Sequence, residues 1–194
     1  LLLDYAGCGL SDGLFADQTL LDWRGDVLDL IDAKAEGPVI IVGSSMGGWL
    51  MLLTALALVQ RDGPGRVAGL VGIAAAPDFT DWGFSDAEKA IILAEGALVE
   101  ETPYSDQPYM TTRDFFQSGE ANRLLDTEIA LTCPVRLLHG EEDGDVPPGI
   151  SLRLSAALAS TDVQVTLVKG GDHRLSRDTD IALLIDTVAR TATN

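Results

Sequence analysis

The stretch from Val39 to Trp49 reads VIIVGSSMGGW and constrains the fold more than any other part of the sequence. Four β-branched residues lead into serines and glycines, and a long apolar run, WLMLLTALALV, follows. This order predicts a buried strand, a sharp turn and a buried helix. Gly43, Ser45 and Gly47 match the pattern G-x-S-x-G, in which larger side chains at the glycine positions would collide. We therefore expect the hydroxyl of Ser45 to be exposed as a nucleophile.

The same letter pattern occurs a second time, from Gly9 to Gly13, so the pattern alone is weak. That second stretch follows a glycine-rich loop and leads into polar, irregular residues. Only the stretch around Ser45 has a strand, a turn and a helix in order. If Ser44 were the exposed serine, Met46 would occupy a position that demands glycine. Ser45 is therefore the preferred candidate.

Apolar or β-branched runs alternate with helical patterns along the chain. The runs predict strands that are covered on both faces, at residues 1–5, 39–42, 67–74, 135–139 and 163–168. Apolar residues recur at helical spacing between them, from Leu20 to Ile31, from Leu152 to Leu158 and from Ile181 to Val188. The alternation predicts an α/β fold with a mostly parallel sheet and flanking helices. The length suits one domain over residues 1–194.

The interval of about 78–133 is longer than a normal crossover between strands and predicts an insertion. Ser85 and Glu88 form a capping box and predict a helix that runs to about Val99, and a second short helix is expected near residues 113–119. Most aromatic residues of the chain lie in this insertion. They form either its own small core or a lid over a site. As lid residues that bind substrate we select Trp82, Phe84 and Tyr109.

Composition excludes several classes of function. Thirteen basic and thirty acidic residues give a net charge of -17, which disfavours nucleic acid and anionic membranes as partners. Residues 37–60 are uncharged, but the glycines and serines among them argue against a membrane span. Cys8 and Cys133 lack a second Cys or a His at zinc-ligand spacing, so we expect reduced thiols and no metal. Gly7 and Gly9 lack dinucleotide-fingerprint spacing, and no cofactor is expected.

A serine nucleophile needs a base, and the chain has two histidines. His139 ends a strand directly before a glycine, and we expect it to be packed at the edge of the sheet. His173 lies in the loop after the last strand, which suits the order serine, acid, histidine. His173 is therefore the candidate base. The acid should come from the loop HGEEDGDVPP, which offers Glu141, Glu142, Asp143 and Asp145.

The segments GSSMGGW, CPVRLLHG and VQVTLVKGGDHRLSR together resemble the α/β-hydrolase superfamily. Within it the sequence is similar to the group of mitochondrial palmitoyl-protein thioesterases, also described as mycophenolic acid acyl-glucuronide esterases, and their bacterial homologues. The likeness extends over nearly the whole chain. That family places its acid in a G-x-x-D-x-x-V-P pattern, which Gly140 to Pro147 matches. The resemblance thus implies Asp143 as the acid, with Ser45 and His173 in the other two roles.

The resemblance implies a serine hydrolase that cleaves ester or thioester bonds through an acyl-enzyme, without a metal or organic cofactor. Its substrate would be a small molecule or an S-acylated protein that carries a cysteine thioester, or an acyl glucuronide. Two alternatives stay open. The chain could be a general carboxylesterase or lactonase, which a preference for O-acyl over S-acyl substrates would reveal. It could also be a catalytically silent hydrolase-like binding module or an inactive fragment, because function depends on the assembled site.

One departure from the family concerns the oxyanion hole. In the family the strand that matches Leu1–Tyr5 is preceded by further strands, one of them central, and by a loop that donates an oxyanion N–H. On that comparison we expect the sequence to be a fragment without the N-terminal part of its domain, with the N–H of Met46 as the remaining donor. Loss of one donor costs about 10²–10³ in kcat, so we expect a poor enzyme. We expect a bacterial cytoplasmic protein, with a mitochondrial location as the alternative.

Overall fold

The computed structural model describes residues 1–101 and 108–193 of the chain. Contacts within the chain divide it into two compact units, which we call the cap unit and the sheet unit. The cap unit comprises Leu1–Leu30 and Asp78–Arg123. The sheet unit comprises Ile31–Pro77 and Leu124–Asn194. Each unit is thus assembled from two separate stretches of sequence.

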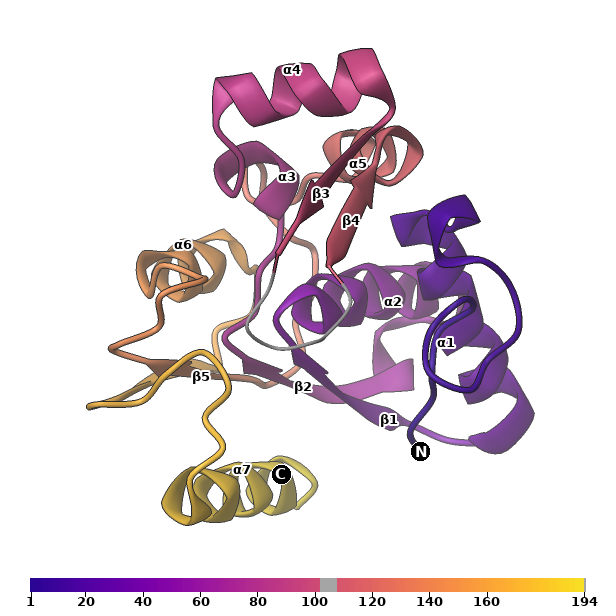
Figure 1. Cartoon of the computed structure of the whole chain (residues 1–194). Helices are drawn as coiled ribbons and strands as arrows, with labels where there is room; N and C mark the ends of the chain where they lie inside the picture. Colours follow the sequence, from indigo (N-terminus) through magenta and orange to yellow (C-terminus); the bar gives the residue numbers. More distant parts are fainter. Residues whose placement is uncertain (102–107, 194) are drawn as a thin grey trace. The chain divides into compact units, whose positions relative to one another are not determined.

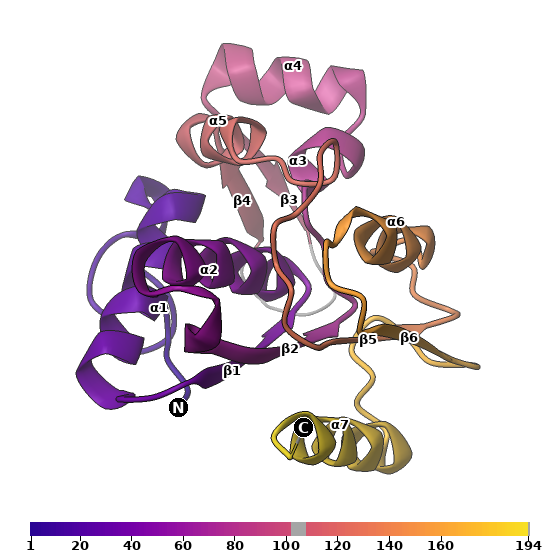
Figure 2. The same cartoon turned by 180° about the vertical axis from the view of Figure 1, so that it is seen from behind.

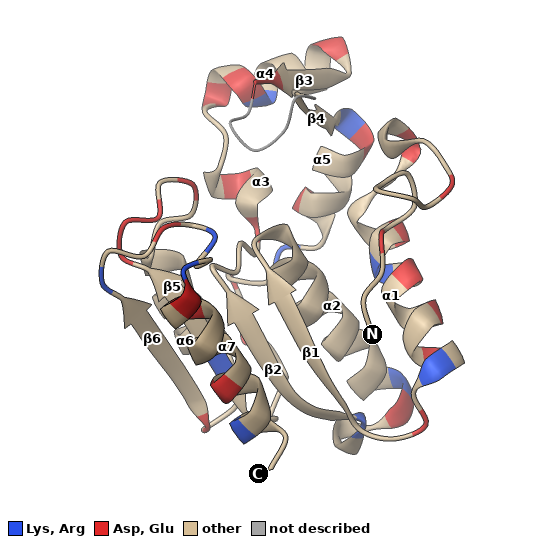
Figure 3. Ribbon diagram, turned by 60° about the horizontal axis from the view of Figure 1, so that its bottom comes forward, with Lys and Arg blue, Asp and Glu red and all other residues tan. Residues whose placement is uncertain are grey.

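The sheet unit is built on four parallel strands in the order β1, β2, β5, β6. Each strand coincides with an apolar or β-branched run that predicted it, because such side chains fit a sheet covered on both faces. Charged residues are absent from the first two of these strands (Figure 3). The bounds are β1 (Val39–Ser44), β2 (Val67–Ile73), β5 (Val135–Gly140) and β6 (Val163–Val168).

Helices cover both faces of this sheet (Figures 1 and 2). On one face lie α2 (Met46–Asp62) and α6 (Gly149–Ala157), and on the other lies α7 (Asp178–Thr191). A Cβ on Gly48 would lie 2.4 Å from the Cβ of Ala75, so this glycine lets α2 approach the chain that follows β2. The strand, turn and helix expected around Ser45 are therefore present in that order.

The second stretch of the cap unit, Asp78–Arg123, holds three helices and a two-stranded antiparallel sheet among its described residues. The capping box of Ser85 and Glu88 opens the middle helix, as expected. That helix ends at Gly96, whose φ of 96° suits glycine, and Val99 lies in the first strand of the small sheet instead of the helix. The elements are α3 (Phe79–Trp82), α4 (Asp86–Glu95), β3 (Ala97–Glu100), β4 (Tyr109–Thr112) and α5 (Arg113–Ala121).

The N-terminal residues form no strand, so the strand expected at residues 1–5 is wrong. Side chains of α1 (Leu20–Lys34) take the place of a neighbouring strand as hydrogen-bond partners. The carboxylate of Asp26 accepts the N–H of Ala6, and the indole N–H of Trp23 donates to the carbonyl oxygen of Ala6 at 2.9 Å. The ring of Tyr5 packs 5.7 Å from that of Trp23. Contacts with side chains of α1 thus outweigh the strand preference of this apolar run.

The uncharged run of residues 37–60 is divided between β1 and the first four turns of α2. Half of α2 is buried against the sheet, which explains its apolar composition without a lipid environment. Among the described residues no helix has the length and apolar character that a membrane crossing requires.

Candidate active site

The turn between β1 and α2 holds Ser45 in a conformation that is uncommon for a residue with a side chain. Its φ is 52° and its ψ is −124°, a region of backbone space that costs of order 1–3 kcal/mol and needs support from its surroundings. Three backbone hydrogen bonds give that support. The N–H of Ser45 donates to Ile73 at 2.9 Å, and its carbonyl accepts from Gly48 at 2.8 Å and from Ala76 at 3.0 Å. The Ser45 hydroxyl does not cap α2, so it stays available for chemistry.

The glycine at the end of β1 is required by a close approach of backbone. A Cβ on Gly43 would lie 2.2 Å from the carbonyl oxygen of Gly47, far inside van der Waals contact. Met46 is the first residue of α2, and N–H groups in a first helical turn have no carbonyl partner within the helix. The helix dipole adds positive potential at the same end. This turn therefore suits a negative charge that develops next to Ser45.

The carboxylate of Asp143 lies in the loop after β5, a loop in which acidic residues predominate (Figure 3). Its side chain is fully buried. Oδ1 accepts the backbone N–H of Asp145 at 2.9 Å and that of Val146 at 2.8 Å. These bonds close a tight turn around the carboxylate. Oδ2 is thereby directed away from the turn and can receive another donor.

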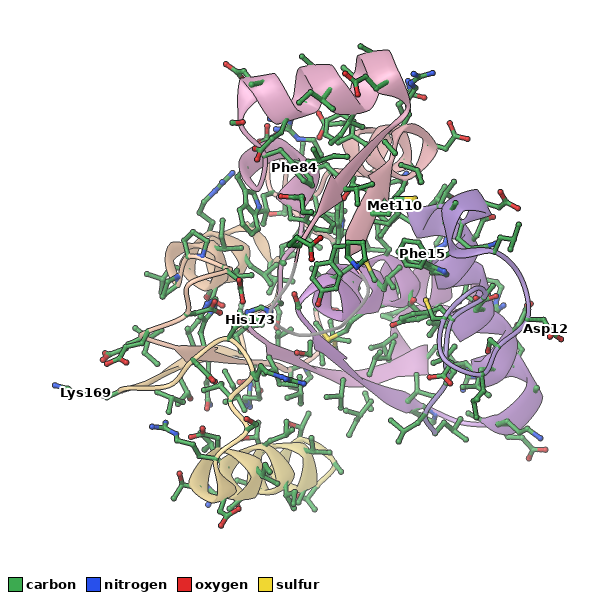
Figure 4. The ribbon with its side chains drawn as sticks, viewed as in Figure 1. Asp12, Phe15, Phe84, Met110, Lys169 and His173 are labelled. Atoms are coloured by element: carbon green, nitrogen blue, oxygen red, sulfur yellow. The ribbon has the colours of Figure 1, made fainter. Side chains whose placement is uncertain are left out.

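His173 supplies that donor. Its Nδ1 lies 2.9 Å from Oδ2 of Asp143, and its side chain is 15% exposed. A carboxylate only accepts hydrogen bonds, so Nδ1 must carry the proton. In the neutral ring Nε2 then keeps its lone pair and can accept a proton. Figure 4 shows His173 at the carboxyl end of the sheet.

The loop that carries His173 folds back over the end of β5. The N–H of Glu142 donates to the carbonyl of Gly171 at 2.8 Å. A Cβ on Gly140 would lie 2.3 Å from the same carbonyl oxygen, so only glycine allows the two loops to touch. Farther along, Leu175 belongs to one buried hydrophobic cluster with Leu138 and with Ile73, at the end of β2. Because Ser45 donates its N–H to Ile73, the turn with Ser45 and the loop with His173 attach to the end of the same strand.

The other acidic candidates of this loop, Glu141, Glu142 and Asp145, are exposed. The ligand atoms of Asp143, Asp145 and His173 lie within 4.8 Å of one another, a spacing that could hold a metal ion. Both oxygens of Asp143 already accept N–H groups, so a metal would have to displace at least one of these bonds. The donor set therefore fits a hydrogen-bonded acid better than a metal ligand.

The three residues selected for substrate binding belong to the cap unit. The ring of Phe84 packs 6.1 Å from Phe79 and 6.2 Å from Phe116, so it takes part in the aromatic core of that unit. Trp82 is the last residue of α3. Tyr109 begins β4 and is 54% exposed. A role in substrate binding stays a prediction for all three.

Sequence reasoning assigned no functional role to His139. It is packed, as expected, but it lies inside the sheet in β5, between β2 and β6, and not at the edge. Its Nε2 is 3.1 Å from Oδ2 of Asp143. The sequence held one signal for this contact. His139 lies near the end of the strand that leads into the loop with Asp143, where a side chain can meet that loop.

Comparison with known sequences yields a family match and longer relatives. The sequence profile described as "Alpha/beta hydrolase family" matches residues 1–190. The chain is 43% identical over 189 residues to the mouse protein "Palmitoyl-protein thioesterase ABHD10, mitochondrial", and the match covers 95% of this chain and 62% of that protein. The human protein of the same name is 40% identical and is covered over 60% of its length. The chain thus spans less than two thirds of these curated relatives.

Two solved structures are similar over nearly the whole chain. One is a protein from Agrobacterium vitis S4 described as an inferred hydrolase, with a TM-score of 0.90 and 40% identity, covering 97% of this chain and 74% of that one. The other is alpha/beta hydrolase domain-containing protein 10 from mouse, with a TM-score of 0.86 and 40% identity, covering 98% of this chain and 76% of that one.

Proposed function

Because the chain belongs to the alpha/beta hydrolase family, we propose that it is a serine hydrolase in which Ser45, His173 and Asp143 act as nucleophile, base and acid. The observation that supports this most is the contact of 2.9 Å between Nδ1 of His173 and the buried carboxylate of Asp143. The positive φ of Ser45 at a strand-to-helix turn is the second support. Together these features match the roles that acyl transfer requires.

In the proposed mechanism Nε2 of His173 accepts the proton of the Ser45 hydroxyl while Oγ attacks the acyl carbonyl. Asp143 keeps the proton on Nδ1 and stabilises the imidazolium that forms. The imidazolium then protonates the leaving sulfur or oxygen as its bond to the acyl carbon breaks, so a thiol or an alcohol departs and an acyl-enzyme remains on Ser45. Water attacks this ester with His173 again as the base, which releases the acid and restores the serine.

The negative charge of the tetrahedral intermediate would develop next to the start of α2. The N–H of Met46 is the donor that we assign to it from this chain. Donors that are fixed in place before the reaction stabilise such a charge without reorganisation. The backbone bonds that hold Ser45 at φ 52° hold the neighbouring peptide in the same orientation.

We propose acyl thioesters as the substrate class. The support is the similarity to proteins named as palmitoyl-protein thioesterases, which covers 95% of this chain. Trp82, Phe84 and Tyr109 are the side chains that we assign to the acyl chain. A general carboxylesterase or lactonase is the second candidate, because the same three catalytic roles serve any activated acyl group.

The first test is labelling with a fluorophosphonate, followed by intact mass and peptide mapping. Wild-type protein should be labelled stoichiometrically on Ser45, whereas Ser45→Ala and His173→Ala should not react. Circular dichroism should confirm that each variant is folded. A folded wild-type protein that does not react would contradict the hydrolase assignment and favour a binding module.

The second test separates the two substrate classes. Matched S-acyl and O-acyl substrates with the same acyl group and a similar leaving group should be compared by kcat/KM. Higher kcat/KM for the thioester supports the thioesterase assignment. Equal values, or a preference for the ester, would replace it with a carboxylesterase. Repeating the comparison with Tyr109→Ala, the most exposed of the three assigned acyl-binding residues, tests whether the cap contributes to KM.

A further inference from the structure

A second histidine contacts the proposed catalytic acid. His139 is the last residue but one of β5, directly before Gly140, and its side chain has no exposed surface. Its Nε2 lies 3.1 Å from Oδ2 of Asp143, the same oxygen that faces Nδ1 of His173. The buried carboxylate thus has an imidazole nitrogen on each of two sides, and only His173 has an assigned role.

The same nitrogen of His139 also holds the turn that surrounds the acid. Nε2 lies 2.9 Å from the carbonyl oxygen of Val146. The N–H of Val146 in turn donates to Oδ1 of Asp143 at 2.8 Å. Val146 is therefore fixed through both of its backbone polar groups, one to the acid and one to His139. Any movement of His139 would move the peptide that anchors the acid.

The surroundings of His139 determine where its proton lies. Nε2 faces a carbonyl and a carboxylate, which only accept, so Nε2 must carry the hydrogen. Nδ1 lies 2.7 Å from Oγ of Ser151, a hydroxyl that can donate to it. Ser151 is also fully buried, in α6. Both ring nitrogens are satisfied when His139 is neutral: its N–H bonds to the carbonyl of Val146, and Nε2 lies 3.1 Å from Oδ2 of Asp143.

We propose that His139 is a positioning residue of this site: its Nε2–H fixes the acid turn through Val146 and stabilises the charge on Oδ2 of Asp143. This proposal rests on the proposed function of Ser45, Asp143 and His173. His139 touches no reacting atom and acts through the acid. Its contribution is to limit how strongly Asp143 attracts the proton on His173, and to keep Oδ2 aimed at Nδ1.

Two substitutions separate the nitrogens of His139. Gln places an amide nitrogen where Nε2 stands and can still donate to Val146 and face Asp143. Asn reaches only as far as Nδ1, so it can still accept from Ser151 but loses the donor towards the acid. Both side chains are neutral, polar and smaller than or similar to His. His139→Gln is therefore the matched control for His139→Asn.

The readout is the rate of fluorophosphonate labelling at Ser45 as a function of pH. Without the N–H of residue 139, more negative charge stays on Oδ2 and favours the protonated imidazole of His173. The pH midpoint of the labelling rate should therefore rise by roughly half a unit in His139→Asn. The plateau rate should fall by about threefold to tenfold, the effect of one lost hydrogen bond. His139→Gln should stay close to wild type on both measures.

Other charged groups lie near His173, but they affect both variants of His139 equally. One carboxylate oxygen of Asp145 lies within 4.8 Å of one ring nitrogen of His173. Asp172 and Arg174 flank it in sequence, and the guanidinium of Arg177 binds Gly170 in the same loop. All four are unchanged in both variants, so their contributions cancel when His139→Asn is compared with His139→Gln.

A second readout does not depend on activity. The chain has two histidines, so either variant leaves His173 with the only imidazole. The chemical shift of the Nδ1–H proton of His173 should differ between His139→Asn and His139→Gln, because this shift depends on the charge on Oδ2 of Asp143.

A midpoint and an Nδ1–H signal that change in His139→Asn and not in His139→Gln support the proposal. Equal values in both variants, or a midpoint that does not rise in His139→Asn, overturn it and leave His139 as a packing residue. If Asn unfolds the protein, His139→Leu replaces it: this variant also lacks the donor towards the acid, and a midpoint and a labelling rate equal to those of His139→Gln would overturn the proposal. If the proposed function itself is wrong, the wild-type protein will not be labelled by the fluorophosphonate. That result differs from a failure of the proposal for His139 alone.

Discussion

The turn at Ser45 and the pair of Asp143 and His173 are positioned by different means. Backbone contacts hold the turn: Ser45 bonds to Ile73, Gly48 and Ala76 through its own N–H and C=O. A side chain is at the centre of the pair, because the carboxylate of Asp143 accepts two backbone N–H groups of its own loop and lies 2.9 Å from Nδ1 of His173. A substitution in the turn should act by steric conflict and change the shape of the site. A substitution in the pair should act through charge and leave the shape intact.

The largest effect on activity is expected for Asp143→Asn. The amide would present an NH₂ group to Nδ1–H of His173, so the imidazole should change tautomer and lose its free Nε2. We expect kcat to fall by about 10⁴-fold with little change in melting temperature. Asp145→Asn is the matched control, since Asp145 is exposed in the same loop. If Asp145→Asn lost more activity than Asp143→Asn, the assignment of the acid would be wrong.

Gly43→Ala should affect both shape and activity. Its Cβ would lie 2.2 Å from the carbonyl oxygen of Gly47, which is backbone and cannot rotate away. We expect a loss of about 1–3 kcal/mol in the free energy of unfolding. A displacement of Ser45 by about 1 Å would reduce labelling by about 10²-fold.

The control for this prediction is Gly25→Ala. A Cβ at Gly25, inside α1, meets nothing within 4 Å, so the protein should be stabilised by about 0.5–1 kcal/mol. Denaturant unfolding and labelling should be measured on both variants. An unchanged labelling rate in Gly43→Ala would show that the turn tolerates a Cβ and that the steric account is incorrect.

Gly140→Ala tests whether the pair also depends on a backbone approach. Its Cβ would lie 2.3 Å from the carbonyl oxygen of Gly171 and 2.4 Å from that of Asp172, so the loop with His173 must move away from β5. We expect labelling to fall by about tenfold or more. Gly144→Ala, where a Cβ meets nothing within 4 Å, should not change it. Equal rates in both would mean that side chains alone hold the pair.

The sheet unit could be predicted from sequence because its signals are local. The β-branched runs of β1 and β6 and the small residues around Ser45 each specify their own conformation. The acid and His173 follow strands of one parallel sheet, so their meeting at its carboxyl end follows from topology. The contact of His139 with the acid could not be predicted, because it depends on how the loop after β5 closes over the strand end.

The cap unit shows what sequence patterns omit. Its capping box at Ser85 was predictable from adjacent residues. The small sheet of β3 and β4 was not, since neither strand is longer than four residues. The N-terminal segment packs with the insertion through aromatic contacts between residues that are far apart in sequence. The ring of Trp23, for example, lies 5.5 Å from that of Phe115. Such contacts leave no periodic signal, because any apolar residue would give the same pattern.

The smallest effect is expected at the ion pair that closes the loop around His173. Arg177 donates to the carboxylate of Asp180 through Nε at 2.8 Å and Nη2 at 2.9 Å, and through Nη1 to the carbonyl of Gly170 at 2.9 Å. This guanidinium therefore ties the start of α7 to the start of the loop. Arg177 is half exposed, so solvent weakens the pair. Arg177→Gln should lower the labelling rate only slightly, by about twofold.

The ion pair of Arg177 and Asp180 makes the loop with His173 sensitive to acid. Hydrogen bonds from Arg177 hold the pKa of the Asp180 carboxyl below its usual value. A lowered pKa in the folded state stabilises the protein above the unfolded pKa of about 3.9, and this stabilisation is lost as the pH falls through the folded value. The melting temperature of wild type should thus exceed that of Asp180→Asn at neutral pH, and the gap should close below about pH 4. Gly43→Ala contains no altered charge, so its deficit relative to wild type should be constant over the same range. If the melting-temperature difference between wild type and Asp180→Asn were equally constant with pH, charge would not hold the loop with His173. That loop would then be held by its backbone shape, as the turn at Ser45 is, and the two regions would not differ.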